Sequence, residues 1–212
     1  MPKPNKNKEK AKAKIPVIER GPMPALILVV ICTVCVALLA LTATMTADAI
    51  AKQEQMAHGS GKQALFPDAA EFPEESADEA IAGIPGAIAI DLTAEDFENV
   101  TGVGRAVDAD GEVVGVLISA ASKGYHGPVP VTVGFSLSGE ITGLLVDASE
   151  ETAGLGQEVG DASFTDQFIG RTTDDKFSVD FVSAATISSV SVVKSVKLAS
   201  AVFDAFMGKG GD

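Results

Sequence analysis

Cysteine is nearly absent from this chain, and its scarcity limits what the chain can be. Only two cysteines occur in 212 residues, Cys32 and Cys35, and both lie inside a long apolar run. The globular part therefore has no disulfide framework. A C-x-x-C pair could hold a metal shared with a neighbouring protein, but no other ligand accompanies this pair. We interpret both cysteines as small residues of a helix interface and expect no metal site.

Positive charge is scarce outside the N-terminus. The first 46 residues carry seven Lys and Arg residues against Glu9 and Glu19, a net charge of +5, which leaves −18 for the rest of a chain whose total is −13. An acidic domain excludes nucleic acid as a partner, because its carboxylates repel phosphates. By the positive-inside tendency, the basic leader lies in the cytoplasm and everything after Thr46 lies on the other side of a membrane.

No charged residue interrupts residues 23–46. About 20 apolar residues suffice for a helix to cross the hydrocarbon layer, so this stretch predicts a single transmembrane helix in the lipid bilayer of the inner or plasma membrane. A cleaved signal peptide is the alternative, because Ala47-Asp48-Ala49 resembles a small-x-small cleavage site. Signal peptides have a shorter apolar region, of roughly 7–15 residues, so we expect an uncleaved anchor.

Composition divides the chain into four segments. Residues 1–22 form a basic tail that cannot bury a core. After the transmembrane helix of residues 23–46, residues 47–86 form a stalk and an acidic connector, and we expect His58-Gly59-Ser60-Gly61 to break the stalk helix. Residues 87–212 form one extracytoplasmic domain.

Two tight turns organise the first half of that domain. Ala109-Asp110-Gly111 and Ser138-Gly139 each lie between two apolar runs. Asp-Gly and Ser-Gly pairs allow the positive φ angles that hairpin turns need, so the sequence predicts β-hairpins over residues 103–120 and 129–147.

The second half of the domain shows one strand pattern and one helix pattern. Residues 176–182 alternate apolar and polar side chains, which predicts a strand with one face in a core. Residues 187–207 repeat apolar side chains at helical spacing, and Gly208 ends the pattern, which predicts a packing helix. We therefore expect an α+β fold with a twisted antiparallel sheet and packing helices.

The junction before the last helix carries the candidate chemistry. It reads Ser183-Ala184-Ala185-Thr186, three small residues followed by a hydroxyl at the start of the helix. Free N–H groups and the positive end of the helix dipole favour a phosphate at such a place. The alternative is that Ser183 and Thr186 simply cap the helix. On the residues alone, capping is the more economical interpretation.

The junction also resembles the S-G-A-T-x-S/T flavinylation motif of the FMN-binding domain, which is found in the G component of Rnf-type electron transport complexes and in the C component of sodium-pumping quinone reductases. Other landmarks of this family occur in the same order, and the resemblance covers about residues 102–207. These landmarks are Gly124-Tyr125-His126-Gly127-Pro128, the run from Gly139 to Gly143, Glu151-Thr152-Ala153-Gly154-Leu155-Gly156, and Gln167-Phe168.

The resemblance implies FMN joined covalently through its phosphate to the hydroxyl of Thr186, by a dedicated flavin transferase. It implies cofactor contacts from Ser183, Ala184, Ala185, Ser188, Glu151, Thr152, Gly154, Leu155, Gly156 and Tyr125. Two residues depart from the family pattern, since Ala184 replaces the usual glycine and Ala153 the usual proline. The first departure adds a methyl group at a position that favours positive φ.

The resemblance further implies an electron-transfer subunit of a membrane complex that moves electrons between ferredoxin and NAD, coupled to sodium or proton translocation. Its partners would be the other membrane proteins of the complex, and it would hold no catalytic residue or substrate site of its own. Alternatives are a protein like the C component of a sodium-pumping NADH:quinone reductase, or a non-redox binding module on a membrane anchor. A hydrolase triad of His126, Asp147 and a serine is disfavoured, because the chain lacks a G-x-S-x-G elbow.

Overall fold

The computed structural model describes residues 23–208, apart from the side chains of residues 23–24 and 43–60. The predicted basic tail lies outside the described residues. The chain divides into two compact units, Met1–Met56 and Ala57–Asp212.

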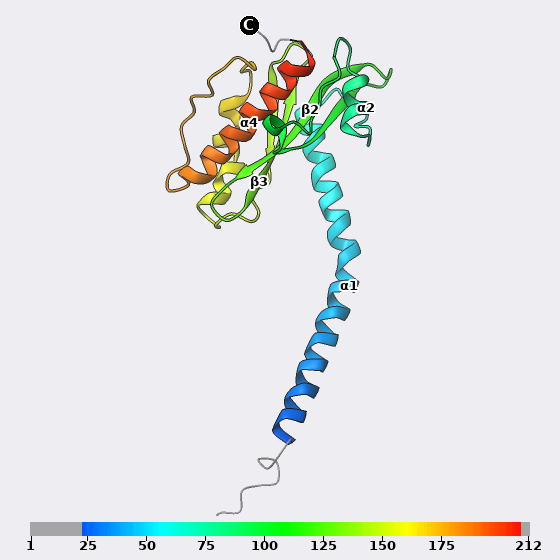
Figure 1. Cartoon of the computed structure of the whole chain (residues 1–212), viewed down its shortest axis with the longest axis vertical. Coiled ribbons are helices and arrows are strands. Elements are labelled where there is room, and N and C mark those ends of the chain that lie inside the picture. The colour runs from blue at the N-terminus through cyan, green and yellow to red at the C-terminus, as the bar shows by residue number, and fades with distance from the viewer. Residues whose placement is uncertain (1–22, 209–212) are drawn as a thin grey trace, which may run out of the picture. The chain divides into compact units, whose positions relative to one another are not determined.

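Helix α1 spans Met23–Leu65, is drawn in blue to cyan in Figure 1, and contains all the described residues of the first unit and the first residues of the second. Its stretch Ala25–Thr42 has a mean hydropathy of 3.0, and none of this stretch is buried. Helix α4 (Thr186–Phe206) is also long and apolar enough to cross a membrane, but 61% of it is buried in the protein. The exposed apolar surface of α1 is therefore the surface suited to lipid, and α4 is a core helix.

The helix break predicted at residues 58–61 is wrong, because α1 continues to Leu65. Gly61 instead permits close packing, since a Cβ at this position would lie only 2.9 Å from Cδ1 of Leu145. Leu65 and the following Phe66 are both buried against the sheet, where the ring of Phe66 covers Gly115. Tertiary packing thus outweighs the low helix propensity of glycine.

Four strands form the antiparallel sheet of the second unit, in the order β1-β2-β3-β4 (Figure 1). They are β1 (Val100–Val107), β2 (Val113–Lys123), β3 (Pro128–Phe135) and β4 (Ile141–Val146). Both predicted hairpins are confirmed, with Gly111 and Gly139 at φ angles of 82° and 88° in their turns. Neighbouring strands pair in sequence order, so the sheet is a simple meander.

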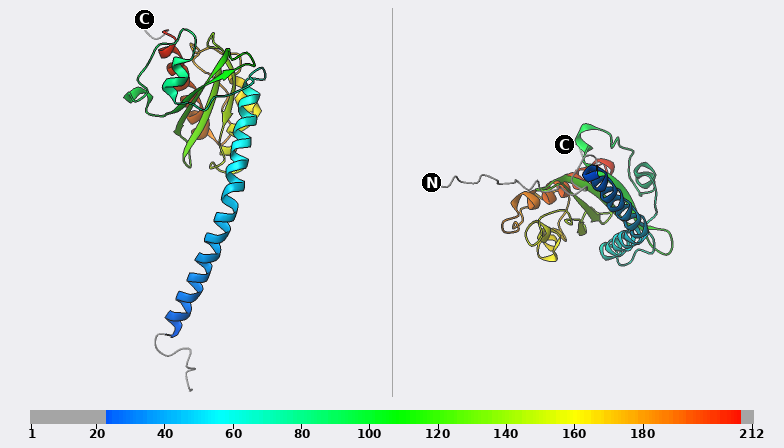
Figure 2. Two further views of the ribbon diagram at one scale, coloured as in Figure 1. Left: turned by 90° about the vertical axis from the view of Figure 1, so that its right-hand side faces the viewer. Right: turned by 90° about the horizontal axis from the view of Figure 1, so that it is seen from below.

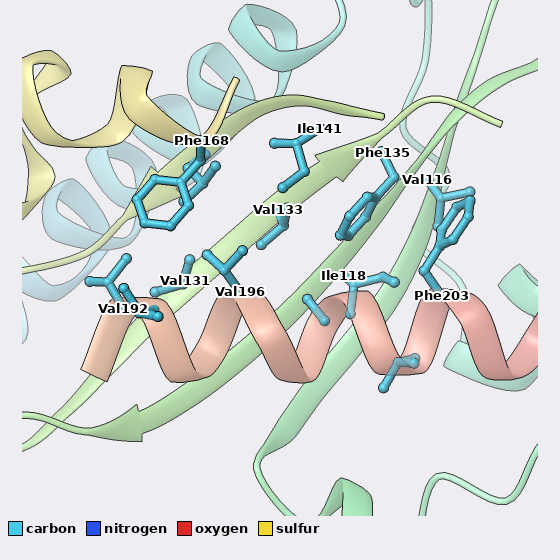
Figure 3. Close-up of a cluster of buried hydrophobic side chains, with 14 of the residues drawn as sticks. Val116, Ile118, Val131, Val133, Phe135, Ile141, Phe168, Val192, Val196 and Phe203 are labelled. Atoms are coloured by element: carbon cyan, nitrogen blue, oxygen red, sulfur yellow. The ribbon is translucent and has the colours of Figure 1, made fainter. Parts of the chain in front are cut away.

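Helix α4 lies across one face of the sheet, and the core fills the space between them (Figures 1 and 2). Figure 3 shows Val196 and Phe203 of the helix facing Ile118 and Val133 of the strands. The ring of Phe203 also lies 5.1 Å from that of Phe135, between centroids. The predicted helix and the predicted α+β fold are therefore confirmed.

Serines on the buried face of α4 tie the helix to the end of β2. Ser191 Oγ donates to the carbonyl of Ser122 at 2.6 Å, and Ser195 Oγ accepts from the N–H of Ser122 at 3.1 Å. Strand β1 ends its pairing with β2 at Ala120. Hydroxyls of the helix therefore satisfy backbone groups just beyond the reach of the neighbouring strand.

The strand predicted over residues 176–182 is wrong, because this segment is irregular. Phe177 has a φ of 48°, which an extended strand does not allow. Side chains satisfy the backbone instead: Gln167 exchanges two hydrogen bonds with Asp180, and Arg171 donates to the carbonyl of Ser178. The alternation does place Phe177 in the core, but Phe181 remains 45% exposed.

Short helices complete the second unit. They are α2 (Ala77–Ala82), η2 (Glu95–Phe97), η3 (Gly156–Gly160), α3 (Ala162–Thr165) and η4 (Asp166–Phe168). Of these, η3 begins directly after the loop that faces the first turn of α4, and it contacts α4. This contact fixes one wall of a cavity at the head of α4.

Candidate functional site

A cavity of about 470 Å³ opens at the first turn of α4. Its lining consists of Tyr125, Glu151, Thr152, Leu155, Gly156, Ala184, Ala185, Thr186, Ile187 and Ser188. Three segments far apart in sequence thus meet here, and all the predicted cofactor residues except Ser183 and Gly154 contribute to the lining. The volume falls within the range typical of small-molecule sites, roughly 300–1,000 Å³.

The backbone turns sharply just before α4. Ala184 has a φ of 62°, in the left-handed region that disfavours any residue with a Cβ. Ala185 follows as the N-cap residue with a φ of −121° and makes no side-chain capping bond. Ser189 stabilises this turn, because its hydroxyl accepts from the N–H of Val182 and donates to the carbonyl of Ala185.

The capping interpretation of the junction is wrong. Ser183 and Thr186 are both exposed, and neither hydroxyl bonds to the helix among the contacts of the described residues. The N–H groups of Thr186, Ile187 and Ser188 likewise have no partner in the described part of the chain. The head of α4 therefore presents free donors and a free hydroxyl to the cavity, the arrangement that favours a phosphate.

Glu151 also lines the cavity and is only 5% exposed. Ser188 Oγ donates to its carboxylate at 2.6 Å, and the N–H of His126 donates at 3.1 Å. Burial raises the pKa of Glu151, but the bonds from Ser188 and from the backbone N–H groups of His126, Gly127 and Tyr125 together outweigh it and leave that pKa below its ordinary value. The carboxylate is therefore charged at neutral pH.

Three apolar side chains line the cavity while remaining open to solvent. Tyr125 is 67% exposed, Ile187 53% and Leu155 44%. Ile187 was missed by the sequence analysis, which assigned it only to the helix. Its position directly after Thr186, on the first turn of α4, was the signal available. Such side chains suit one face of a flat, partly exposed aromatic ring.

Two predicted residues lie apart from this cavity. Ser183 lines a neighbouring hollow of about 260 Å³, together with Gln167 and Asp180. Gly154 has a φ of 71° and shapes the loop that carries Leu155, without reaching the lining. A further cavity of about 510 Å³ lies on the other face of the sheet, where Arg105 already pairs with Glu75. It contains none of the predicted cofactor residues.

Comparison with known protein families shows which class of domain this one resembles. Residues 124–201 match the family described as FMN-binding domain, and residues 24–60 match the one described as RnfG N-terminal region. The cavity, the free donors of α4 and the exposed hydroxyl all lie within the first match. Residues 124–201 thus resemble an FMN-binding domain, on a chain that also carries an exposed apolar helix.

Among characterised proteins, the chain resembles the G components of ion-translocating oxidoreductase complexes. It is 29% identical over 172 residues to the G component of the Na⁺-translocating ferredoxin:NAD⁺ oxidoreductase complex of Acetobacterium woodii, which covers 75% of this chain and 80% of that protein. It is 34% identical over 119 residues to the G component of the ion-translocating oxidoreductase complex of Methanosarcina acetivorans, which covers 47% of this chain and 63% of that protein.

A solved structure aligns with part of this chain. The crystal structure of the C component of the Na⁺-translocating NADH-quinone reductase from Parabacteroides distasonis aligns with a TM-score of 0.41 and 21% identity. The alignment covers 52% of this chain and 63% of that one. The chain therefore spans less than two thirds of the Parabacteroides and Methanosarcina proteins.

Proposed function

We propose that this chain is an electron-transfer subunit of a membrane-bound, Rnf-type ferredoxin:NAD oxidoreductase complex, with FMN attached to Thr186 through a phosphoester. The observation that carries the proposal is the exposed Thr186 hydroxyl beside the uncapped N-terminus of α4, inside a cavity of suitable size. Similarity to the G components of such complexes supports the kind of complex. The proposal includes coupling to sodium or proton translocation.

The residues present fit an FMN group. The free N–H groups of Ile187 and Ser188 can hold phosphate oxygens, and the dipole of α4 favours their negative charge. Leu155 and Tyr125 supply apolar walls for the ring, and Thr152 adds a hydroxyl at the rim. When bound, FMN supplies the electron-accepting and electron-donating chemistry, while the protein binds and orients it.

The open cavity suits electron relay rather than catalysis on a substrate. Its three apolar wall residues remain 44–67% exposed, so a ring held there can be approached closely by a partner. Covalent attachment then keeps the cofactor in place despite the shallow site. We accordingly assign the chain no catalytic residue, and we expect other membrane proteins of the complex to exchange electrons with it.

The membrane arrangement is part of the same proposal. The basic residues before α1 favour a cytoplasmic N-terminus and an FMN-binding domain outside the cytoplasm. A domain in that location has no flavin pool from which to rebind a lost cofactor, which favours a covalent bond. A flavin transferase acting outside the cytoplasm is then required for maturation.

Flavin fluorescence of the denatured protein tests the attachment. We expect the full chain, purified from membranes with an active flavin transferase, to fluoresce as a band after denaturing electrophoresis. Thr186→Val should abolish the fluorescence, because valine keeps the shape of threonine without the hydroxyl. Thr152→Val is the matched control, since Thr152 lines the same cavity and is also exposed, and this variant should keep full fluorescence.

Two results would contradict the proposal. Fluorescence that persists in Thr186→Val would move the attachment to another residue. An unmodified peptide at residues 183–193 by mass spectrometry, with the transferase active, would favour the non-redox binding module instead. The positive φ of Ala184, where the family motif has glycine, is the feature that favours this second candidate.

A further inference from the structure

Glu151 is the one acidic or basic side chain among the buried residues of the described part of the chain. The described residues give it no ion-pair partner, because the two ion pairs they form are Arg105 with Glu75 and Arg171 with Asp175. A buried carboxylate without a countercharge is unfavourable unless hydrogen bonds stabilise it. The position of this unpaired carboxylate beside the cavity therefore needs a structural explanation.

Hydrogen bonds make Glu151 a link between two walls of the cavity. Oε2 accepts from Ser188 on the first turn of α4, and Oε1 accepts from the backbone of His126 in the loop that carries Tyr125. Glycines make room for the carboxylate, since a Cβ on Gly124 would lie 2.6 Å from Oε1 and one on Gly156 2.8 Å from Oε2. The site is thus built around this side chain.

The charge of Glu151 acts on whatever occupies the cavity. The carboxylate lines the same hollow as Thr186, so a ring tethered there lies within a few side-chain lengths of it. Adding electrons to the ring makes it more negative, and a nearby buried charge is weakly screened by water. Reduction of the ring is therefore opposed by this carboxylate.

We propose that Glu151 is a positioning residue for the flavin and that its charge holds the flavin's reduction potential low. The inference rests on the proposed function, because it requires FMN in this cavity. Its two parts are separable: the hydrogen bonds set the geometry of the Tyr125 loop against α4, whereas the charge sets the equilibrium between oxidised and reduced flavin.

Redox titration of the flavin-loaded full chain tests the charge. Glu151→Gln keeps the size and an accepting oxygen but removes the charge. At the wild-type midpoint potential, the ratio of reduced to oxidised flavin should rise on the order of tenfold. Glu150→Gln is the matched control, because it makes the same change in net charge at the neighbouring, exposed position. Solvent screening should leave its midpoint close to that of the wild type.

An opposite variant separates charge from structure. Ser188→Ala removes one donor to the carboxylate but keeps the carboxylate, so its charge is less compensated and the midpoint should fall. An unchanged or raised midpoint in Ser188→Ala contradicts the inference, as does a Glu151→Gln midpoint equal to that of Glu150→Gln. If Glu151→Gln does not fold, Ser188→Ala alone decides.

The two proposals can fail separately. Wild-type protein that carries no flavin contradicts the proposed function before any potential is measured. Flavin-loaded protein whose midpoint potential does not change when the charge at residue 151 is removed contradicts only the role assigned to Glu151.

Discussion

Ala184 sits in a backbone conformation that costs an alanine free energy. Its φ of 62° brings the Cβ close to the following carbonyl, a penalty of roughly 1–2 kcal/mol that glycine does not have. The turn directs residues 184–186 into the cavity, so the strain lies at the candidate site itself. Strain at such a position persists because the surrounding structure imposes it.

Ala184→Gly is therefore expected to stabilise the protein. The free energy of unfolding should rise by about 0.5–1 kcal/mol, because the lost strain exceeds the extra entropy of glycine in the unfolded chain. Thermal or urea unfolding of the detergent-solubilised chain measures the change. Ala201→Gly is the control, because Ala201 is exposed and lies inside α4. This variant should lower the free energy of unfolding by about 1 kcal/mol. A loss at both positions would show that Ala184 is unstrained.

Sequence reasoning at the residue scale found groups with distinctive chemistry or spacing. Thr186 and Leu155 could be predicted from the family motifs, and the cavity contains both. The burial of Glu151 without a cation partner among the described residues could not be predicted, because its burial and its hydrogen bonds depend on segments 25 or more residues away. Ile187 was missed because one residue can serve both a helix pattern and a cavity wall.

At the scale of elements, the turn residues predicted the hairpins correctly, whereas the alternation of apolar and polar side chains predicted a strand that does not form. Gly111 and Gly139 adopt the positive φ angles that their hairpins need. Residues 176–182 alternate as a strand does, yet they pair with no neighbouring strand among the described residues, and side chains of Gln167 and Arg171 supply their hydrogen bonds. Pairing depends on the whole sheet, which a seven-residue pattern does not contain.

Ser195→Ala tests the attachment of α4 to β2. Removing the hydroxyl leaves the N–H of Ser122 buried without a partner, which should lower the free energy of unfolding by about 1–3 kcal/mol. Ser200→Ala is the control, because Ser200 is also buried but bonds only to Val196 of its own helix. It should change stability by less than about 0.5 kcal/mol, since alanine favours helix. Equal effects in urea unfolding would argue against a special role for Ser195.

At the scale of the whole molecule, the chain combines an apolar helical stretch suited to lipid with a globular domain suited to water. Composition alone predicted the apolar stretch, but not that α1 would continue to Leu65. The extension depends on contacts of Gly61 with Leu145 and of Phe66 with Gly115, which join residues tens of positions apart. Such contacts exist only once the sheet has formed.

Removal of the first unit is expected to release the second from the membrane. The full chain should stay in the membrane pellet through an alkaline carbonate wash, because Ala25–Thr42 exposes a continuous apolar surface. A fragment of residues 57–212 keeps Leu65, Phe66 and the complete core, so it should be soluble and show the same cooperative melting as the domain in the full chain. Release of the full chain by carbonate, or sedimentation of the fragment, would contradict this division.

The irregular segment before α4 bears on when the cofactor can be attached. Side chains of Gln167, Arg171, Asp175 and Ser189 hold most of the backbone of residues 177–182, and one backbone bond runs from the N–H of Ala185 to the carbonyl of Val182. Thr186, which follows this segment, is already exposed at the head of α4, so its hydroxyl can be reached while the strands and α4 stay paired and packed. Under the proposed attachment, maturation can follow folding and export, and the order of these steps in biosynthesis is not constrained by the core.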